Sequence, residues 1–186
     1  MRLFVGIPLP EALHVGIRRL QEQLAASGAE LSTVPPGNLH FTVKFLGDVA
    51  DDKVEVVASR LAEVAERHAC FSVSLRGAGA FPSPDFARAV WVGIGESAPF
   101  VSLVREVRDQ LASFRKEEHD ALQIHLTVAR VRPPKNREQL AQVIRQFSAE
   151  GFGSFVAERL VLYESTLLGA GAAYRAVRAF PLKTAF

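Results

Sequence analysis

The sequence predicts a bilobal α+β fold in which one structural unit occurs twice, related by an approximate two-fold axis. A His-x-Thr motif occurs at His40 and again at His125, 85 positions later (125 − 40). The run Phe4-Val5-Gly6-Ile7 resembles Trp91-Val92-Gly93-Ile94, 87 positions later (91 − 4). Both halves read as strand, helix, His-Thr strand, helix and strand. We therefore expect antiparallel sheets that face a central groove, with the helices outside.

The length and composition fit a single domain made of two pseudo-symmetric lobes. The chain has 186 residues, of which 48% are hydrophobic and 23% are charged, an ordinary globular balance. We assign the whole of residues 1–186 to this domain. The repeat covers approximately residues 1–80 and 88–165, and closing strands continue to residue 186.

Charge and cysteine content exclude several classes of protein. A formal net charge of +2 is too small to indicate a nucleic-acid partner by itself. Cys70 is the single cysteine, which excludes an intrachain disulfide and a cysteine-based metal cage. No apolar stretch approaches the roughly 18 residues that suggest a membrane span. We expect a soluble, cytoplasmic protein that does not bind membranes and is a monomer.

The first half follows from two periodicities. Its expected elements are strand, helix, His-Thr strand, helix and strand, at residues 3–7, 10–28, 39–46, 52–69 and 71–75. Pro10 suits the first turn of a helix, where its missing N–H costs little, and Gly28 suits the end of one. The first helix has an apolar stripe at helical spacing, made of Leu13, Ile17, Leu20 and Leu24.

The second half begins after residues 77–85, whose two glycines and two prolines predict a loop. A strand at 89–94 and a helix capped by Ser97 come next. The second His-Thr strand at 123–130 is expected to stop at Pro133-Pro134. Asn136 and Gln139 resemble a capping box at the start of another helix. Two closing strands, at 155–163 and 174–182, are joined by a glycine-rich turn.

The two His-Thr strands are candidates for the walls of a binding site. Side chains at i and i+2 of a strand point to the same face, so His40 lies beside Thr42, and His125 beside Thr127. Polar side chains of this kind suit a cleft better than a core. The approximate two-fold axis would set the two strands across a shared groove, which predicts a site with two histidines.

Two imidazoles suit displacement at phosphorus. One neutral histidine can act as a general base while a protonated partner acts as a general acid. Threonine hydroxyls and a guanidinium can stabilise the non-bridging oxygens. Lys44 lies at i+4 from His40, on the same face of a regular strand. Arg130 lies at i+5 from His125, on the other face, unless the strand bulges or ends near Ala129.

These residues resemble the 2H phosphoesterases, in particular the RNA 2′,3′-cyclic phosphodiesterases also called 2′-5′ RNA ligases. The resemblance covers nearly the whole chain. It includes residues 2–7, residues 36–47 around the first motif, residues 90–93, residues 125–130 and residues 162–165. One His-x-Thr motif is a weak signal, but two at this separation within these flanks are highly specific.

The resemblance implies a metal-independent enzyme, without a cofactor, that opens a 2′,3′-cyclic phosphate at an RNA end to a 2′-phosphate. His40 would be the proton donor and His125 the proton acceptor. Thr42 and Thr127 would hold the phosphate oxygens. Since the family has an arginine at the end of its second motif, Arg130 becomes the preferred cation and Lys44 a secondary one. The expected partners are RNA with cyclic phosphate ends, or cyclic nucleotides.

Three alternatives stay open at this point. Two histidines can bind zinc, although the sequence shows no further ligands at suitable spacing. A module that binds RNA ends without catalysis could use the same groove. The same acid and base could join or cleave 2′-5′ linkages. An aromatic side chain in the loop from Phe81 to Phe86 is also a candidate for stacking on a base.

Overall fold

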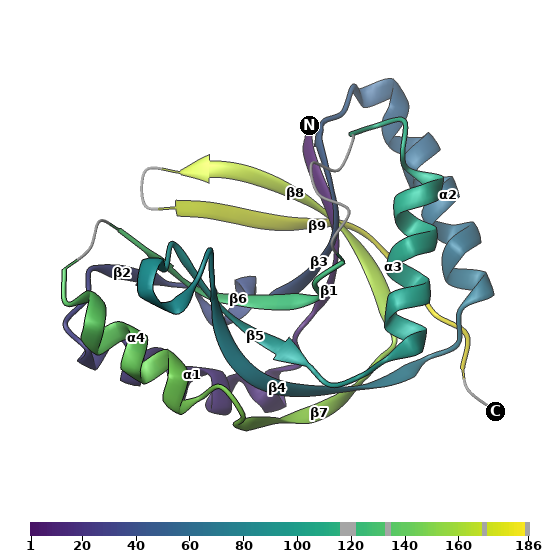
Figure 1. The fold of residues 1–186 in the computed structure, drawn as a ribbon. Helices are drawn as coiled ribbons and strands as arrows, with labels where there is room; N and C mark the ends of the chain where they lie inside the picture. Colours follow the sequence, from purple (N-terminus) through teal and green to yellow (C-terminus); the bar gives the residue numbers. More distant parts are fainter. Residues whose placement is uncertain (116–121, 133–134, 169–170, 185–186) are drawn as a thin grey trace.

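The computed structural model describes residues 1–115, 122–132, 135–168 and 171–184. Within these residues, nine strands pair into one sheet in the order β7-β4-β5-β6-β3-β1-β8-β9, with β2 beside β6 (Figure 1). All of these pairings are antiparallel. The strands are β1 (Arg2–Pro8), β2 (Leu31–Thr33), β3 (His40–Asp48), β4 (Phe71–Phe81), β5 (Ala89–Ile94), β6 (His125–Val131), β7 (Gly151–Ala157), β8 (Arg159–Leu168) and β9 (Gly171–Pro181).

Helices pack in two pairs outside the sheet. Helices α2 (Asp51–Arg67) and α3 (Ala98–Gln110) form one pair, and α1 (His14–Ala26) and α4 (Arg137–Gln146) form the other (Figure 1). Short 3₁₀ helices occur at η1 (Glu11–Leu13), η2 (Pro36–Asn38) and η3 (Pro84–Phe86). The predicted α+β class with antiparallel strands is confirmed.

The core lies between the sheet and these helices. Each helix buries one apolar stripe, such as Ile17, Leu20 and Leu24 of α1, which are 0% exposed. Burial of such side chains removes apolar surface from water and stabilises the packed layers. From the sheet, Phe41 is fully buried and its ring lies 5.7 Å from that of Phe100 in α3. The helices therefore cover the face of the sheet to which Phe41 points.

The two halves of the fold join at the centre of the sheet. Strands β3 and β6 are neighbours there, paired through Phe41 and Leu126. Outward from this junction, β1 and β5 come next, then β8 and β4, then β9 and β7. One continuous sheet, rather than two separate ones, therefore carries both His-Thr strands.

The loop predicted at residues 77–85 is wrong in its first part, because β4 continues to Phe81. The glycines belong to the strand. Gly77 has a φ of +75° beside a register shift in the pairing of β4 with β5. A Cβ at Gly79 would overlap the ring of Trp91 from the neighbouring strand. A bulge and a close approach, rather than a turn, account for these residues.

Three other details differ from the prediction. Asn136 precedes α4 in a left-handed conformation with a φ of 54°, and its side chain makes no capping hydrogen bond, so the capping box is not formed. The strand expected at 155–163 divides at Glu158 into β7 and β8. Strand β2 was not predicted. The expected stop at Pro133-Pro134 lies outside the described residues.

Candidate active site

The two His-Thr motifs lie on one face of the sheet. Phe41 and Leu126 are paired and buried, so the residues on either side of them point to the opposite face. In an antiparallel pair this register sets His40 opposite Thr127 and Thr42 opposite His125. His40 and His125 are then diagonal neighbours across the two strands. Diagonal positions in an antiparallel pair lie about 7–8 Å apart. Imidazoles at this spacing leave room for a tetrahedral phosphate between them.

Each imidazole is held by a hydrogen bond of the same kind, to the backbone carbonyl two residues earlier in the chain. Nδ1 of His40 lies 2.7 Å from the carbonyl oxygen of Asn38, and Nδ1 of His125 lies 2.8 Å from that of Gln123. A carbonyl oxygen only accepts hydrogen bonds, so each Nδ1 carries the proton that it donates. Each Nε2 is thereby left as the atom that can accept or release a proton. Nε2 of His40 lies 3.1 Å from Oγ1 of Thr42.

Burial governs the protonation of the two histidines. It lowers the pKa of His40 below the ordinary value of 6.5, the hydrogen bond to Asn38 acts in the opposite direction, and the charge of His125 lowers the pKa further. Burial also lowers the pKa of His125, against the hydrogen bond to Gln123. A positive charge on His125 therefore disfavours a second positive charge on His40.

Aromatic rings surround His40. Its ring centroid lies 4.8 Å from that of Phe4, 5.9 Å from that of Tyr163 and 5.2 Å from that of Tyr174. Phe4 also stacks on Tyr163 at 5.0 Å. These rings exclude water from one side of the imidazole and fix its orientation. The sequence pattern did not identify the two tyrosines as site residues, although both stand in predicted strands.

A second aromatic group borders His125. The ring of Phe81 lies 4.9 Å from the imidazole in an edge-to-face arrangement, and that of Trp91 lies 6.4 Å away. Nε1 of Trp91 is buried without a hydrogen-bond partner among the described residues. Phe81 reaches the site because β4 continues past the glycines, a feature that the loop prediction concealed.

Strand bulges decide which cation shares the histidine face. Between β5 and β6 the register shifts next to Val128, since Trp91 pairs with Thr127 whereas Val90 pairs with Ala129. The extra residue reverses the alternation, so that Ala129 is buried and Arg130 is exposed on the side of Thr127. Arg130 therefore shares the face of His125, as expected for a strand that bulges.

Lys44 was expected on the face of His40 if its strand were regular, and the structure does not meet that condition. A similar register shift occurs in β3, where Thr42 pairs with Gly6 and Lys44 pairs with Val5. Lys44 is 2% exposed, and its Nζ donates a hydrogen bond to the carbonyl oxygen of Arg115, just beyond α3. Phe45 takes the side of the histidines instead, with its ring 6.0 Å from that of Phe4.

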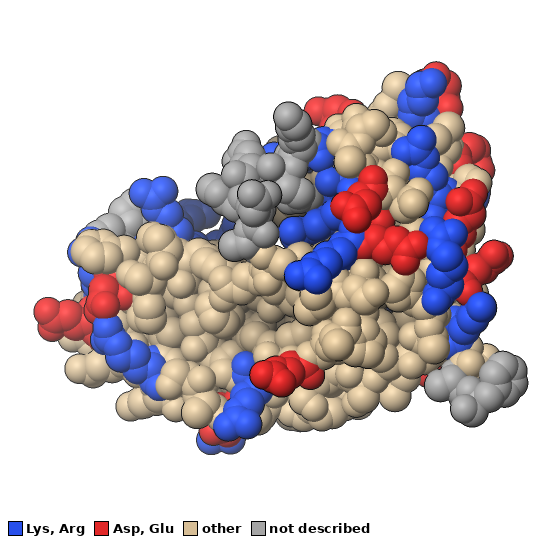
Figure 2. All heavy atoms as spheres, turned by 45° about the vertical axis from the view of Figure 1, so that its right-hand side comes forward, with Lys and Arg blue, Asp and Glu red and all other residues tan. Residues whose placement is uncertain are grey.

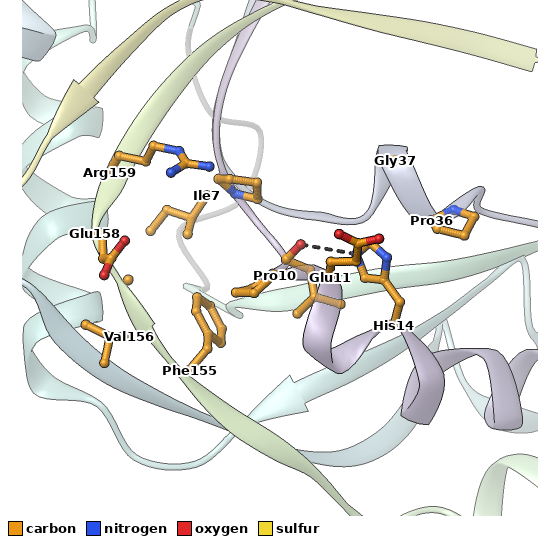
Figure 3. Close-up of a pocket in the computed structure, with 13 residues that line it drawn as sticks. Ile7, Pro10, Glu11, His14, Pro36, Gly37, Phe155, Val156, Glu158 and Arg159 are labelled. Atoms are coloured by element: carbon orange, nitrogen blue, oxygen red, sulfur yellow. Dashed lines mark hydrogen bonds between the residues drawn. The ribbon is translucent and has the colours of Figure 1, made fainter.

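A cavity of about 530 Å³ lies on the other side of the sheet (Figure 3). It is bordered by the end of β1, the start of α1 and the junction of β7 and β8, and neither His40 nor His125 lines it. Its Phe155 stacks on Phe41, whose ring points away from the histidine face. His14, at its edge, contacts the carbonyl oxygen of Leu9 at 3.2 Å. This cavity is separate from His40 and His125, which are called the paired histidines below.

Two absences hold for the described residues only. No three or more His, Cys, Asp or Glu side chains gather there in a way that could hold a metal ion. No helix in the described ranges has both the length and the apolar character needed to cross a membrane.

Comparison with known proteins identifies the family. The family model described as LigT like Phosphoesterase matches residues 7–91. A protein named RNA 2′,3′-cyclic phosphodiesterase from Methanothermobacter thermautotrophicus is 34% identical over 98% of this chain and 99% of its own length. The chain belongs to the LigT-like phosphoesterases. A relative of the same name from Archaeoglobus fulgidus is 31% identical over 97% of this chain and 99% of its own.

Two solved structures share the fold. The crystal structure of the Thermus thermophilus protein TT0787 has a TM-score of 0.84 at 26% identity, over 99% of both chains. That of Escherichia coli LigT in apo form has a TM-score of 0.76 at 21% identity, over 98% of this chain and 97% of that one.

Proposed function

We propose that this protein hydrolyses RNA 2′,3′-cyclic phosphodiester ends to 2′-phosphomonoesters, with two histidines as general acid and general base and without a metal. One observation carries the proposal: His40 and His125 lie on one face of the sheet, each with Nδ1 held by a backbone carbonyl. Membership of the LigT-like phosphoesterases and the name shared by the two archaeal relatives support the same reaction.

The reaction proceeds by in-line displacement at phosphorus. Nε2 of His125 accepts a proton from a water molecule whose oxygen forms the new bond to phosphorus. The bond between phosphorus and the 3′ oxygen breaks, and Nε2 of His40 donates its proton to that oxygen. The products are a 2′-phosphate and a free 3′ hydroxyl. The imidazoles exchange protonation states, and solvent restores them before the next turnover.

The neighbouring polar groups bind the phosphate. Thr42 and Thr127 donate hydroxyl hydrogen bonds to its non-bridging oxygens, and each stands opposite a histidine in the register of β3 and β6. Arg130, on the same face, neutralises the negative charge on those oxygens as it develops. Lys44 has no part in this step, because its side chain lies on the helix side of the sheet.

The test is product analysis with purified protein. A nucleoside 2′,3′-cyclic phosphate, or an RNA with that end, is incubated in EDTA, and the phosphate isomer of the product is identified by ³¹P NMR. We expect only the 2′-phosphate. A 3′-phosphate product would contradict the assigned roles, and loss of turnover in EDTA with recovery on adding zinc would support a zinc enzyme instead.

Substitution separates this enzyme from a module that only binds RNA ends. His40→Ala and His125→Ala should each lower kcat by at least about 100-fold, the usual contribution of a general acid or base. RNA ends should still bind to these variants. Wild-type protein that binds such ends and never converts them would favour the non-catalytic module. Joining of RNA ends into a 2′-5′ linkage would favour ligation.

The strand order also supports a two-lobed organisation of the domain. We infer that the lobes are repeats covering approximately residues 1–80 and 88–165, followed by closing strands. Around the junction of β3 and β6, the first strand of each repeat flanks the His-Thr strand of the same repeat, β1 beside β3 and β5 beside β6. In addition, a register shift follows the threonine of each motif, next to Val43 and Val128.

A further inference from the structure

A basic cavity of about 630 Å³ lies beyond Arg130, at the far end of β6. Three segments enclose it: the end of β6 with Arg132, the stretch from Pro82 to Arg88, and the start of α4. The short helix η3 packs beside α4 (Figure 1). Leu140 of α4, which is 2% exposed, provides an apolar part of the wall. No residue proposed for the reaction lines this cavity.

The charged side chains described in the lining of this cavity are all positive. Arg88, Arg132, Lys135 and Arg137 contribute cations, and no described carboxylate lines the cavity. Arg132 has a carboxylate nearby, since its Nη1 lies 3.9 Å from Oε1 of Glu30. Figure 2 shows a different pattern on the side of α2 and α3, where acidic and basic residues are interspersed. Such a concentration of cations around one cavity favours a polyanion as its ligand.

An aromatic side chain stands at the edge of the same cavity. Phe86 is 61% exposed, and the guanidinium of Arg137 lies over its ring at 4.8 Å. The segment that carries Phe86 is anchored, because Asp85 accepts two hydrogen bonds from Arg145 of α4, at 2.7 and 2.6 Å. A fixed, exposed ring beside cations is the arrangement that binds single-stranded nucleic acid, by stacking on a base while the cations contact phosphates.

One of the segments that line the cavity begins beside His125. Phe81 contacts the ring of His125, and the next residue, Pro82, lines the cavity. Strand β6 also leads from His125 through Arg130 to Arg132. Seven residues of strand span about 23 Å, a length that accommodates several nucleotides. A chain whose 3′ end reaches the histidines can therefore extend into this cavity.

We propose that this cavity is a subsite for the RNA strand on the 5′ side of the reacting end, binding its phosphates through Lys135 and Arg137 and one base on Phe86. The inference rests on the proposed function, because it places the reacting end at the histidines. It makes an oligonucleotide, rather than a cyclic mononucleotide, the preferred substrate.

The first test compares substrates of different length. KM and kcat are measured for a nucleoside 2′,3′-cyclic phosphate and for oligoribonucleotides, from a dinucleotide upward, with the same cyclic end. For wild type, KM should fall with length and then level off once the cavity is filled. Phe86→Ala and Arg137→Ala should each raise KM for the longer substrates about 5- to 20-fold and leave the mononucleotide unchanged.

The second test separates phosphate contacts from stacking. The test measures the slope of log KM against log salt concentration for a long substrate. In Lys135→Ala and Arg137→Ala this slope should decrease by about 0.7 for each phosphate contact removed. In Phe86→Ala it should not change. Arg105→Ala is the matched control, since Arg105 is an exposed arginine of α3 in the other helix pair. It should behave as wild type in both tests.

Specific results would overturn the subsite. These are a wild-type KM independent of length, or equal losses on mononucleotide and oligonucleotide in the cavity variants at unchanged melting temperature. Failure of wild type to convert any cyclic phosphate would instead overturn the proposed function. In that case, fluorescence anisotropy with labelled single-stranded RNA on the same variants still decides whether the cavity binds RNA.

Discussion

At the scale of single residues, one extra residue in a strand determines which cation joins the paired histidines. Regular alternation would place Lys44 beside His40 and turn Arg130 away from His125. The register shifts next to Val43 and Val128 reverse both positions. Lys44 is buried against the carbonyl of Arg115, while Arg130 is exposed on the side of Thr127.

This placement predicts different consequences for the two cations. Arg130→Gln should lower kcat/KM for a cyclic phosphate by about 100-fold, because it removes a charge that stabilises the transition state. Lys44→Met should keep kcat/KM within about threefold of wild type and lower the unfolding free energy by about 1–3 kcal/mol, since the Arg115 carbonyl loses its donor. Steady-state kinetics and urea unfolding measure these effects. A larger kinetic loss in Lys44→Met than in Arg130→Gln would refute the assignment.

The two lowered pKa values predict the pH dependence of the reaction. Burial lowers the pKa of both His40 and His125, so in the free enzyme both change protonation below 6.5. Activity requires one neutral and one protonated imidazole, and kcat/KM should peak midway between the two pKa values, hence below pH 6.5. A bound phosphate anion favours the protonated forms, so the profile of kcat should lie at higher pH. A kcat/KM optimum above pH 7 would contradict this expectation.

At the scale of elements, β4 has a double role, pairing with β7 through its first part and with β5 through its second. Its glycines make the second role possible. Gly79 leaves the space that the ring of Trp91 occupies, and the strand then delivers Phe81 to the ring of His125. Small residues in a strand can thus position aromatic ones in the neighbouring site.

Gly79→Ala should therefore disturb both stability and activity. The added methyl group would overlap the ring of Trp91, which has to move, at an expected loss of about 1–3 kcal/mol in unfolding free energy. Displacement of Trp91 and Phe81 should also reduce kcat. Gly151→Ala is the matched control in β7, where a Cβ would meet nothing within 4 Å. Equal melting temperatures and rates for the two variants would show that the close contact has no effect.

At the scale of the whole molecule, stability and the site are linked through protonation. The folded protein holds both histidines at a lower pKa than the unfolded chain does, so the unfolded state binds more protons in the window below pH 6.5. The contribution of the two histidines to the unfolding free energy should therefore be fully present above about pH 6.5. It should be lost as pH decreases through the folded pKa values. The carboxyl group of Glu106 affects the unfolding free energy at a lower pH than the two histidines do. Although burial opposes the change, hydrogen bonds from His68 and Arg67 lower its pKa.

Urea unfolding at a series of pH values tests this linkage. The stability of the His40→Gln, His125→Gln double variant should depend less on pH between about 5 and 7 than that of wild type, because two groups that discriminate between the folded and unfolded states are removed. His14→Gln serves as a control at a histidine outside the paired site. Identical slopes for the double variant and wild type would contradict the pKa shifts.

Patterns of residue type predicted much of this molecule. Alternation and helical stripes indicated most of its strands and helices, and the repeated His-x-Thr motif indicated a site with two histidines. The family resemblance pointed to Arg130 ahead of Lys44. These signals are local in the chain, since periodicity reports which side of an element is buried. They were therefore available without knowledge of the packing.

Local patterns in the sequence were enough to predict the α+β class, the order of the main elements and a site with two histidines. Only the tertiary structure decided the bulges that place Lys44 and Arg130, the continuation of β4 to Phe81, and the approach of Tyr163 and Tyr174 to His40. The reason is physical. Bulges, glycine contacts and ring packing depend on partners far away in the chain, and the register of those partners is set only when the whole sheet assembles.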